Sequence, residues 1–100
     1  MKVVEKGSAW ILYAEGEAIF LEALCSHGAV DYNFFIELNS EERHDYKKFG
    51  SEYLSRLSYE IHYSAPGVIG NCSIYKERCV SKQYIDQFAA AYSAWRKQQA

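Results

Sequence analysis

The segment from Val30 to Leu38 alternates between apolar and polar residues and runs directly into a helix start signal. The apolar positions are Val30, Tyr32, Phe34, Ile36 and Leu38. Because successive side chains of a β-strand point to opposite faces, this alternation predicts a strand with one buried face. Asn39 and Glu42 follow at the spacing of a capping box, which predicts a helix N-terminus. A strand joined at once to a helix limits the chain to folds that mix the two.

Two apolar runs precede this strand and predict a β-hairpin. They are Ala9–Ala14 and Ala18–Cys25, separated by Glu15-Gly16-Glu17. Gly16 can supply the positive φ that a tight hairpin turn requires. A further short strand at Lys2–Glu5 would add a fourth member to the sheet.

Helical periodicity follows the capping box. Apolar residues recur at three- and four-residue steps at Tyr46, Phe49, Tyr53, Leu54, Leu57 and Ile61. This spacing predicts one amphipathic helix of about four turns, ending before Pro66-Gly67. Gly50 lies on the apolar face, where we expect it to let the helix approach the sheet closely. A last helix is predicted from Ser81, with Ile85, Phe88, Tyr92 and Trp95 on its buried stripe.

The order of these elements predicts an α+β fold. We expect an antiparallel three-stranded β-meander, four-stranded if Lys2–Glu5 joins it, followed by two α-helices packed on one face. A chain of 100 residues has room for one hydrophobic core, so residues 1–100 are expected to form a single domain. The second face of the sheet is then expected to be open to solvent.

Charge is distributed unevenly along the chain. Residues 15–45 contain eight acidic residues and one arginine, while the other 69 residues contain ten Lys or Arg and five acids. An acidic surface repels nucleic acid and accelerates encounter with basic proteins. An alternative is that these acids only solvate strand edges and complement the dipole at a helix start.

The open sheet face and the helix start that follows it predict a surface that binds a protein partner. Its candidate residues are Phe20, Glu22, Asp31, Asn33, Phe35, Glu37, Glu41 and Asp45. The aromatic side chains would supply desolvated contact area, and the acids would supply steering and register. Alternatively, Phe20 and Phe35 are covered by the N-terminal segment or by a second copy of the chain in a homodimer.

No pattern in the sequence predicts catalysis, a cofactor or a metal site. Zinc ligands usually come in close pairs two to four residues apart, and of the cysteines and histidines only Cys25 and His27 lie close together. Cys72 and Cys79 are seven positions apart, and Cys25 is expected to be a small buried thiol. The glycine-rich phosphate-binding motifs are absent.

The N-terminal segment and the cysteine count favour a cytoplasmic protein. Met1–Glu15 lacks the uninterrupted apolar stretch of a signal peptide, and no apolar run reaches the length of about 18 residues that a membrane span needs. An odd number of cysteines without an export signal predicts reduced thiols.

The chain resembles the small acidic α/β immunity proteins that bacteria use against their own or neighbouring toxins. The features that carry the resemblance are Val30–Leu38 leading into Asn39-Ser40-Glu41-Glu42, the acidic segment 15–45 and the lack of a catalytic signature. In that class an acidic surface covers the cationic active site of a nuclease toxin. The resemblance therefore implies an inhibitor whose partner is a basic toxin domain. Anti-CRISPR proteins have the same style and act on the same principle.

Two other functions stay open at this point. One is a small enzyme or ligand-binding domain with a pocket between the sheet and the irregular segment 64–80. The other is a homo-oligomeric structural module that uses the aromatic face of the sheet.

Overall fold

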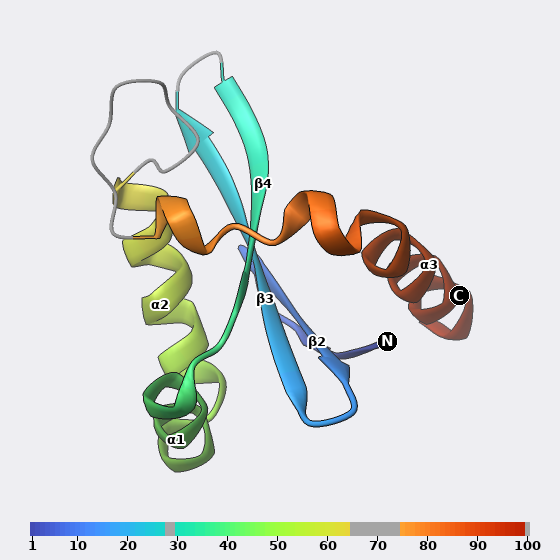
Figure 1. The fold of residues 1–100 in the computed structure, drawn as a ribbon, viewed down its shortest axis with the longest axis horizontal. Coiled ribbons are helices and arrows are strands. Elements are labelled where there is room, and N and C mark those ends of the chain that lie inside the picture. The colour runs from blue at the N-terminus through green and yellow to red at the C-terminus, as the bar shows by residue number, and fades with distance from the viewer. Residues whose placement is uncertain (28–29, 65–74, 100) are drawn as a thin grey trace.

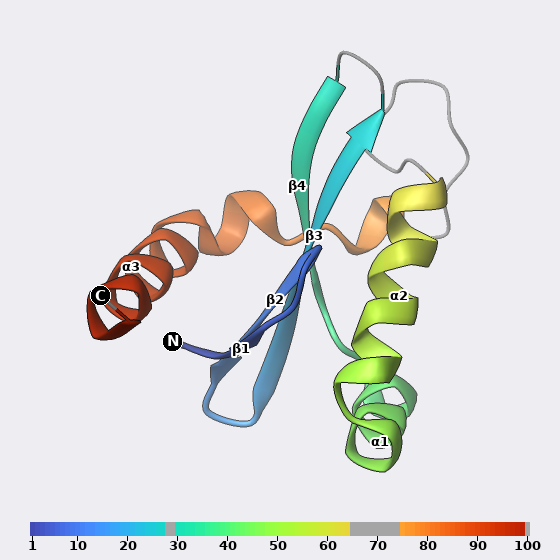
Figure 2. The ribbon, with the colours of Figure 1, turned by 180° about the vertical axis from the view of Figure 1, so that it is seen from behind.

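The chain folds into an antiparallel sheet with helices on both of its sides (Figures 1 and 2). The structure, a computed structural model, describes residues 1–27, 30–64 and 75–99. Its elements are β1 (Lys2–Lys6), β2 (Trp10–Glu15), β3 (Ala18–His27), β4 (Val30–Glu37), α1 (Ser40–Phe49), α2 (Ser51–Ser64), a 3-10 turn (Lys76–Arg78) and α3 (Ser81–Gln99). Within these residues the strands pair in the order β1-β2-β3-β4. The predicted α+β class is confirmed, and the leading strand makes the sheet four-stranded.

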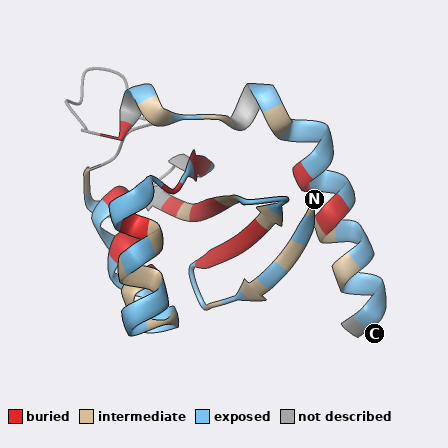
Figure 3. Cartoon of the chain, turned by 60° about the horizontal axis from the view of Figure 1, so that its bottom comes forward, coloured by how far each residue is buried: buried red, intermediate tan, exposed pale blue. Residues whose placement is uncertain are grey.

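The first face of the sheet carries the larger core, and α2 covers it (Figure 3). The strands contribute Trp10, Leu12, Leu21, Ala23, Cys25, Phe34 and Ile36 to this core, and α2 contributes Leu54, Leu57 and Ile61. The alternation predicted for β4 is thus confirmed at Phe34 and Ile36. Full burial of one such leucine or isoleucine contributes about 1.5–3 kcal/mol, so this face supplies much of the stabilisation of the fold.

The helix start predicted after β4 is confirmed as a capping box. The side chain of Asn39 accepts a hydrogen bond from the backbone N–H of Glu42 at 2.9 Å. The carboxylate of Glu42 in turn accepts one from the backbone N–H of Asn39 at 2.9 Å. Two otherwise unpaired donors of the first turn are satisfied in this way.

The single long helix predicted after the capping box is wrong, because the chain breaks it at Gly50. Gly50 has φ +69° and ψ −148°, a conformation that is essentially restricted to glycine, and its N–H donates to the carbonyl of Tyr46 at 2.7 Å. A Cβ at this position would meet no atom within 4 Å, so close approach to the sheet is not its role. The break separates α1 from α2 and leaves Phe49 exposed rather than on the core face.

The second face of the sheet is not open as expected, because α3 packs on it. Phe20 and Phe35, predicted to be exposed, keep only 1% and 6% of their surfaces accessible. Phe88 of α3 stacks on Phe35 with ring centroids 4.2 Å apart and meets Phe20 edge-on at 5.6 Å. These contacts form a second, smaller core of Ile11, Tyr13, Phe20, Phe35, Phe88 and Ala91. The prediction that both helical regions lie on one face is therefore wrong.

The chain reaches the second face by crossing the outer edge of β4. Cys79 forms an isolated antiparallel bridge with Ile36, and the N–H of Val80 donates to the carbonyl of Phe35 at 2.9 Å. One residue earlier, Arg78 donates to both carboxylate oxygens of Glu42, at 2.9 Å and 2.5 Å. Paired donors on a planar guanidinium fix orientation as well as distance. The crossing is thus held at the edge of β4, beside Phe35 and Ile36, and Figure 1 shows the chain passing the end of this strand.

Replacing Phe88 with alanine tests whether α3 is a stabilising part of the fold. Because Phe88 is 2% exposed and contacts four aromatic rings, Phe88→Ala should lower the free energy of unfolding by about 3–5 kcal/mol. Ile85→Ala, on the same helix but 51% exposed, is the control and should stay within about 0.5 kcal/mol of the parent. Urea unfolding measures both. Equal stabilities of the two variants would contradict the packing described for α3.

Candidate functional site

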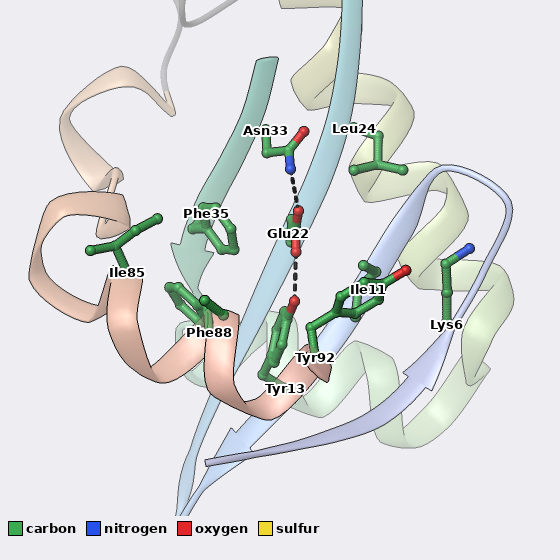
Figure 4. Close-up of a pocket in the computed structure, with 11 residues that line it drawn as sticks. Lys6, Ile11, Tyr13, Glu22, Leu24, Asn33, Phe35, Ile85, Phe88 and Tyr92 are labelled. Atoms are coloured by element: carbon green, nitrogen blue, oxygen red, sulfur yellow. Dashed lines mark hydrogen bonds between the residues drawn. The ribbon is translucent and has the colours of Figure 1, made fainter. Parts of the chain in front are cut away.

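A groove lies between the second face of the sheet and α3 (Figure 4). Its volume is about 440 Å³, and its lining is mostly apolar and aromatic. Strands β2, β3 and β4 form the floor, and α3 forms one wall through Ile85, Phe88, Ala89 and Tyr92. α3 covers the part of the sheet around Phe20 and Phe35, and the groove occupies the neighbouring part.

Glu22 is the one acidic residue among the described residues that line this groove, and it is 5% exposed. It sits on β3, which has strands on both sides, with Ile11 of β2 and Phe35 of β4 directly opposite it. These apolar neighbours keep water from the carboxylate. Alternation along β3 places Glu22 on the same face as Phe20, so its burial is a consequence of α3 covering that face.

Two hydrogen bonds hold the carboxylate of Glu22 in place, as Figure 4 shows. The hydroxyl of Tyr13 donates to Oε1 at 2.6 Å, and Nδ2 of Asn33 donates to Oε2 at 2.6 Å. Tyr13 lies on β2 and Asn33 on β4, each diagonal to Glu22 in the strand register. The three side chains therefore form a row across the three strands that floor the groove.

Burial controls the ionisation of this row. Desolvation raises the pKa of the Glu22 carboxyl, and the hydrogen bonds from Tyr13 and Asn33 oppose the shift without cancelling it. The pKa of the Tyr13 hydroxyl is also raised, first by burial and then by its hydrogen bond to the Glu22 carboxylate. A carboxyl poised in this way can bind a cation or exchange a proton, and such groups are enriched at functional sites.

The groove unites three of the eight residues predicted to bind a partner. Glu22, Asn33 and Phe35 all line it. Phe20 is buried beneath Tyr84 and Phe88 and is not reachable. The expected exposure of Phe20 and Glu22 is therefore wrong, and the cause in both cases is α3.

The other predicted residues lie elsewhere. Glu37 is exposed at the end of β4, and Glu41 is exposed in the first turn of α1. Asp45 is partly exposed beside Phe49 and Tyr53, at the junction of α1 and α2. The side chain of Asp31 lies outside the described part of the chain. Of the seven predicted residues whose side chains the structure describes, Glu22, Asn33 and Phe35 share the groove.

Sequence reasoning missed the other groove residues, above all Tyr13, Phe88 and Tyr92. The position of Tyr13 could have been predicted. Pairing Ala9–Ala14 with Ala18–Cys25 across the Gly16 turn places Tyr13 on the same face as Glu22, and the register of β2 and β3 has this form. The residues of α3 could not be found in this way, because strand register carries no information on where a distant helix packs.

Neither of the two cysteines that the structure describes, Cys25 and Cys79, lines the groove. Cys25 is 3% exposed within the first core, as predicted, and burial raises the pKa of its thiol. Cys79 is exposed at the crossing over β4. Cys72 lies among residues 65–74, which are outside the described residues, as is therefore most of the segment 64–80 beside which a ligand pocket was expected. In the ranges that the structure does describe, no three His, Cys, Asp or Glu side chains gather closely enough to hold a metal ion.

Comparison with known proteins found no matching family model, no matching curated protein and no matching solved structure. Over the described ranges, no helix combines the length and apolar character required to cross a bilayer.

The raised pKa of Glu22 predicts a pH-dependent stability. Because ionisation is less favourable in the folded chain than in the unfolded one, the stability contributed by the neutral carboxyl is present at low pH. It is lost as the pH rises from the ordinary glutamate range through the raised pKa. Glu22→Gln should remove this loss, so the variant should gain stability relative to the parent as the pH approaches neutrality.

Thermal unfolding from acidic to neutral pH measures this difference. Glu37→Gln, which neutralises an exposed carboxylate on the same sheet face, is the matched control and should not show the same gain. A constant gap between Glu22→Gln and the parent across the whole pH range would contradict the assignment.

Proposed function

We propose that this chain is a binding protein that inhibits a basic protein partner, in the manner of the bacterial toxin-immunity proteins it resembles. The observation that carries the proposal is the groove, where Glu22, Asn33 and Phe35 meet beneath α3. A concave, mostly apolar site with one oriented carboxylate suits recognition of a protruding cationic group. Inhibition would follow from covering the partner's active site.

Exposed acids near one end of the sheet support the same proposal. The N–H of Leu38 donates to the carbonyl of Ile19 at 2.8 Å, and Nη1 of Arg43 approaches the carbonyl of Glu17 at 3.4 Å. The turn between β2 and β3 therefore lies beside the start of α1. The exposed carboxylates of this region are Glu17, Glu37 and Glu41. Charges at the rim of an interface mainly accelerate encounter with a partner of opposite charge.

A small-molecule binding function is the second candidate. The groove volume of about 440 Å³ falls within the range of about 300–1,000 Å³ that ligand pockets span. This site differs from the pocket expected beside residues 64–80, because its wall is α3. A homodimer built on the aromatic face of the sheet is not proposed, because α3 packs on that face.

Binding kinetics test the inhibitor proposal. We expect a gene for a basic toxin domain to lie beside the gene for this chain. A catalytically inactive form of that domain is the partner to use, and stopped-flow mixing measures its association rate. We expect an association rate that falls as salt is added, and Glu37→Lys should slow association several-fold at low salt. Co-expression with the active toxin domain should restore growth of the host cell.

Glu52→Lys is the control for charge reversal. Glu52 is exposed on α2, which lies across the sheet from α3, so reversing its charge changes the net charge equally but away from the groove. Its association rate should fall less than that of Glu37→Lys. A complex that forms at the same rate at low and high salt, or no protection by co-expression, would overturn the proposal.

A further inference from the structure

We propose that the groove is a socket for one organic cation, an ammonium or guanidinium group on a short apolar stem, with Glu22 as its counter-ion. In the complex this group would be a lysine or arginine side chain of the partner, and to that extent the inference rests on the proposed function. The chemistry of the socket itself depends on the groove residues alone.

The Glu22 carboxylate has unused capacity to accept hydrogen bonds. Tyr13 donates to Oε1 and Asn33 donates to Oε2, one bond to each oxygen. A carboxylate can accept about four hydrogen bonds in all. Across the described residues no ion pair joins Glu22 to a basic side chain. Lys6 is exposed at the mouth of the groove, and Figure 4 shows its amine turned away from Glu22.

The walls of the groove suit a cation with an apolar stem. Tyr13, Phe35, Phe88 and Tyr92 supply aromatic surface, against which an apolar stem can pack. Ile11, Leu24 and Ile85 supply aliphatic surface, against which a methylene chain can pack. The volume of about 440 Å³ is in the lower half of the range for ligand pockets, which fits one long side chain better than a large ligand.

Electrostatics select the charge of the occupant. An anion would be repelled by Glu22, and a neutral occupant would exclude water from the ionised carboxylate without compensating it. A cation compensates the charge and can donate to the free lone pairs. It is therefore the one class of occupant that the buried carboxylate favours.

Binding of a cation should be coupled to release of a proton. The titratable and polar groups that line the groove with Glu22 are Tyr13 from β2, Asn33 from β4, Lys6 from β1 and Tyr92 from α3, and of these Tyr13 and Asn33 donate to it. None of them supplies a carboxylate that could replace it. Because a bound cation favours the charged form of Glu22, affinity should rise with pH as this carboxyl ionises.

Titration of the full chain with small probes tests the socket without any partner. The probes are n-butylammonium, n-butylguanidinium and the neutral n-butylurea, and the readout is NMR chemical shift of the groove residues. We expect saturable shifts at Asn33 and Phe88 with the two cations, and weaker binding of n-butylurea. Glu22→Gln should weaken cation binding by about tenfold and change n-butylurea binding by a much smaller factor, because no ion pair is lost with the neutral probe.

A second variant leaves Glu22 intact. Ile85→Lys introduces a positive charge on the α3 wall at a position that is 51% exposed, so the fold should tolerate it. It should weaken binding of the cations by a larger factor than binding of n-butylurea, which loses only the packing on Ile85. Equal affinities for charged and neutral probes, no shift at the groove, or unchanged cation binding in Glu22→Gln would overturn the socket.

The outcome separates the socket from the proposed function. If the toxin domain binds Glu22→Gln as tightly as the parent protein, the socket is wrong while the inhibitor proposal stands. If the cationic probes bind and depend on Glu22 but no basic protein partner is inhibited, the socket stands and the inhibitor proposal is wrong.

Discussion

The crossing of the chain over the edge of β4 determines on which face of the sheet α3 packs, and therefore whether a groove can form. Arg78 is held by both oxygens of Glu42, and the next residues pair with Ile36 and Phe35 along the free edge of the strand. This contact also covers part of an exposed strand edge, which is a common site of unwanted association. Because the chain is passed to the second face at this point, α3 can stack Phe88 on Phe35 and create a groove. Without the crossing, the sheet would have one covered face and no concave site.

The features that could be predicted from the sequence are those with local causes. The alternation in β4, the capping box of Asn39 and Glu42, and the turn at Gly16 each depend on residues a few positions apart. Gly50 was identified but given the wrong role, since period alone does not distinguish a glycine that permits close packing from one that breaks a helix. The side of the sheet on which α3 packs depends on Arg78 reaching Glu42, 36 positions earlier, and periodicity cannot report such a contact.

The same long-range contact explains why the candidate site differs from the one predicted. Placing Glu22, Asn33 and Phe35 on one face was correct, because strand register determines it. Treating that face as open was wrong, and the error turned a buried, oriented carboxylate into a surface charge. A buried carboxylate contributes less to stability than an apolar residue that fills the same space. Departures of this kind from the rules of core composition tend to occur where a protein has a task to perform.

The two hydrophobic clusters share the sheet but lie on opposite faces of it, and they differ greatly in size. Regions with fewer buried contacts open at lower free energy than the global transition. Detachment of α3 would therefore be a sub-global event that leaves the α2 side of the sheet folded. It would also remove the wall of the groove that α3 forms. Binding in the groove and amide hydrogen exchange along α3 are consequently linked. An occupant should slow amide exchange along the whole of α3, although it contacts only one or two turns of that helix.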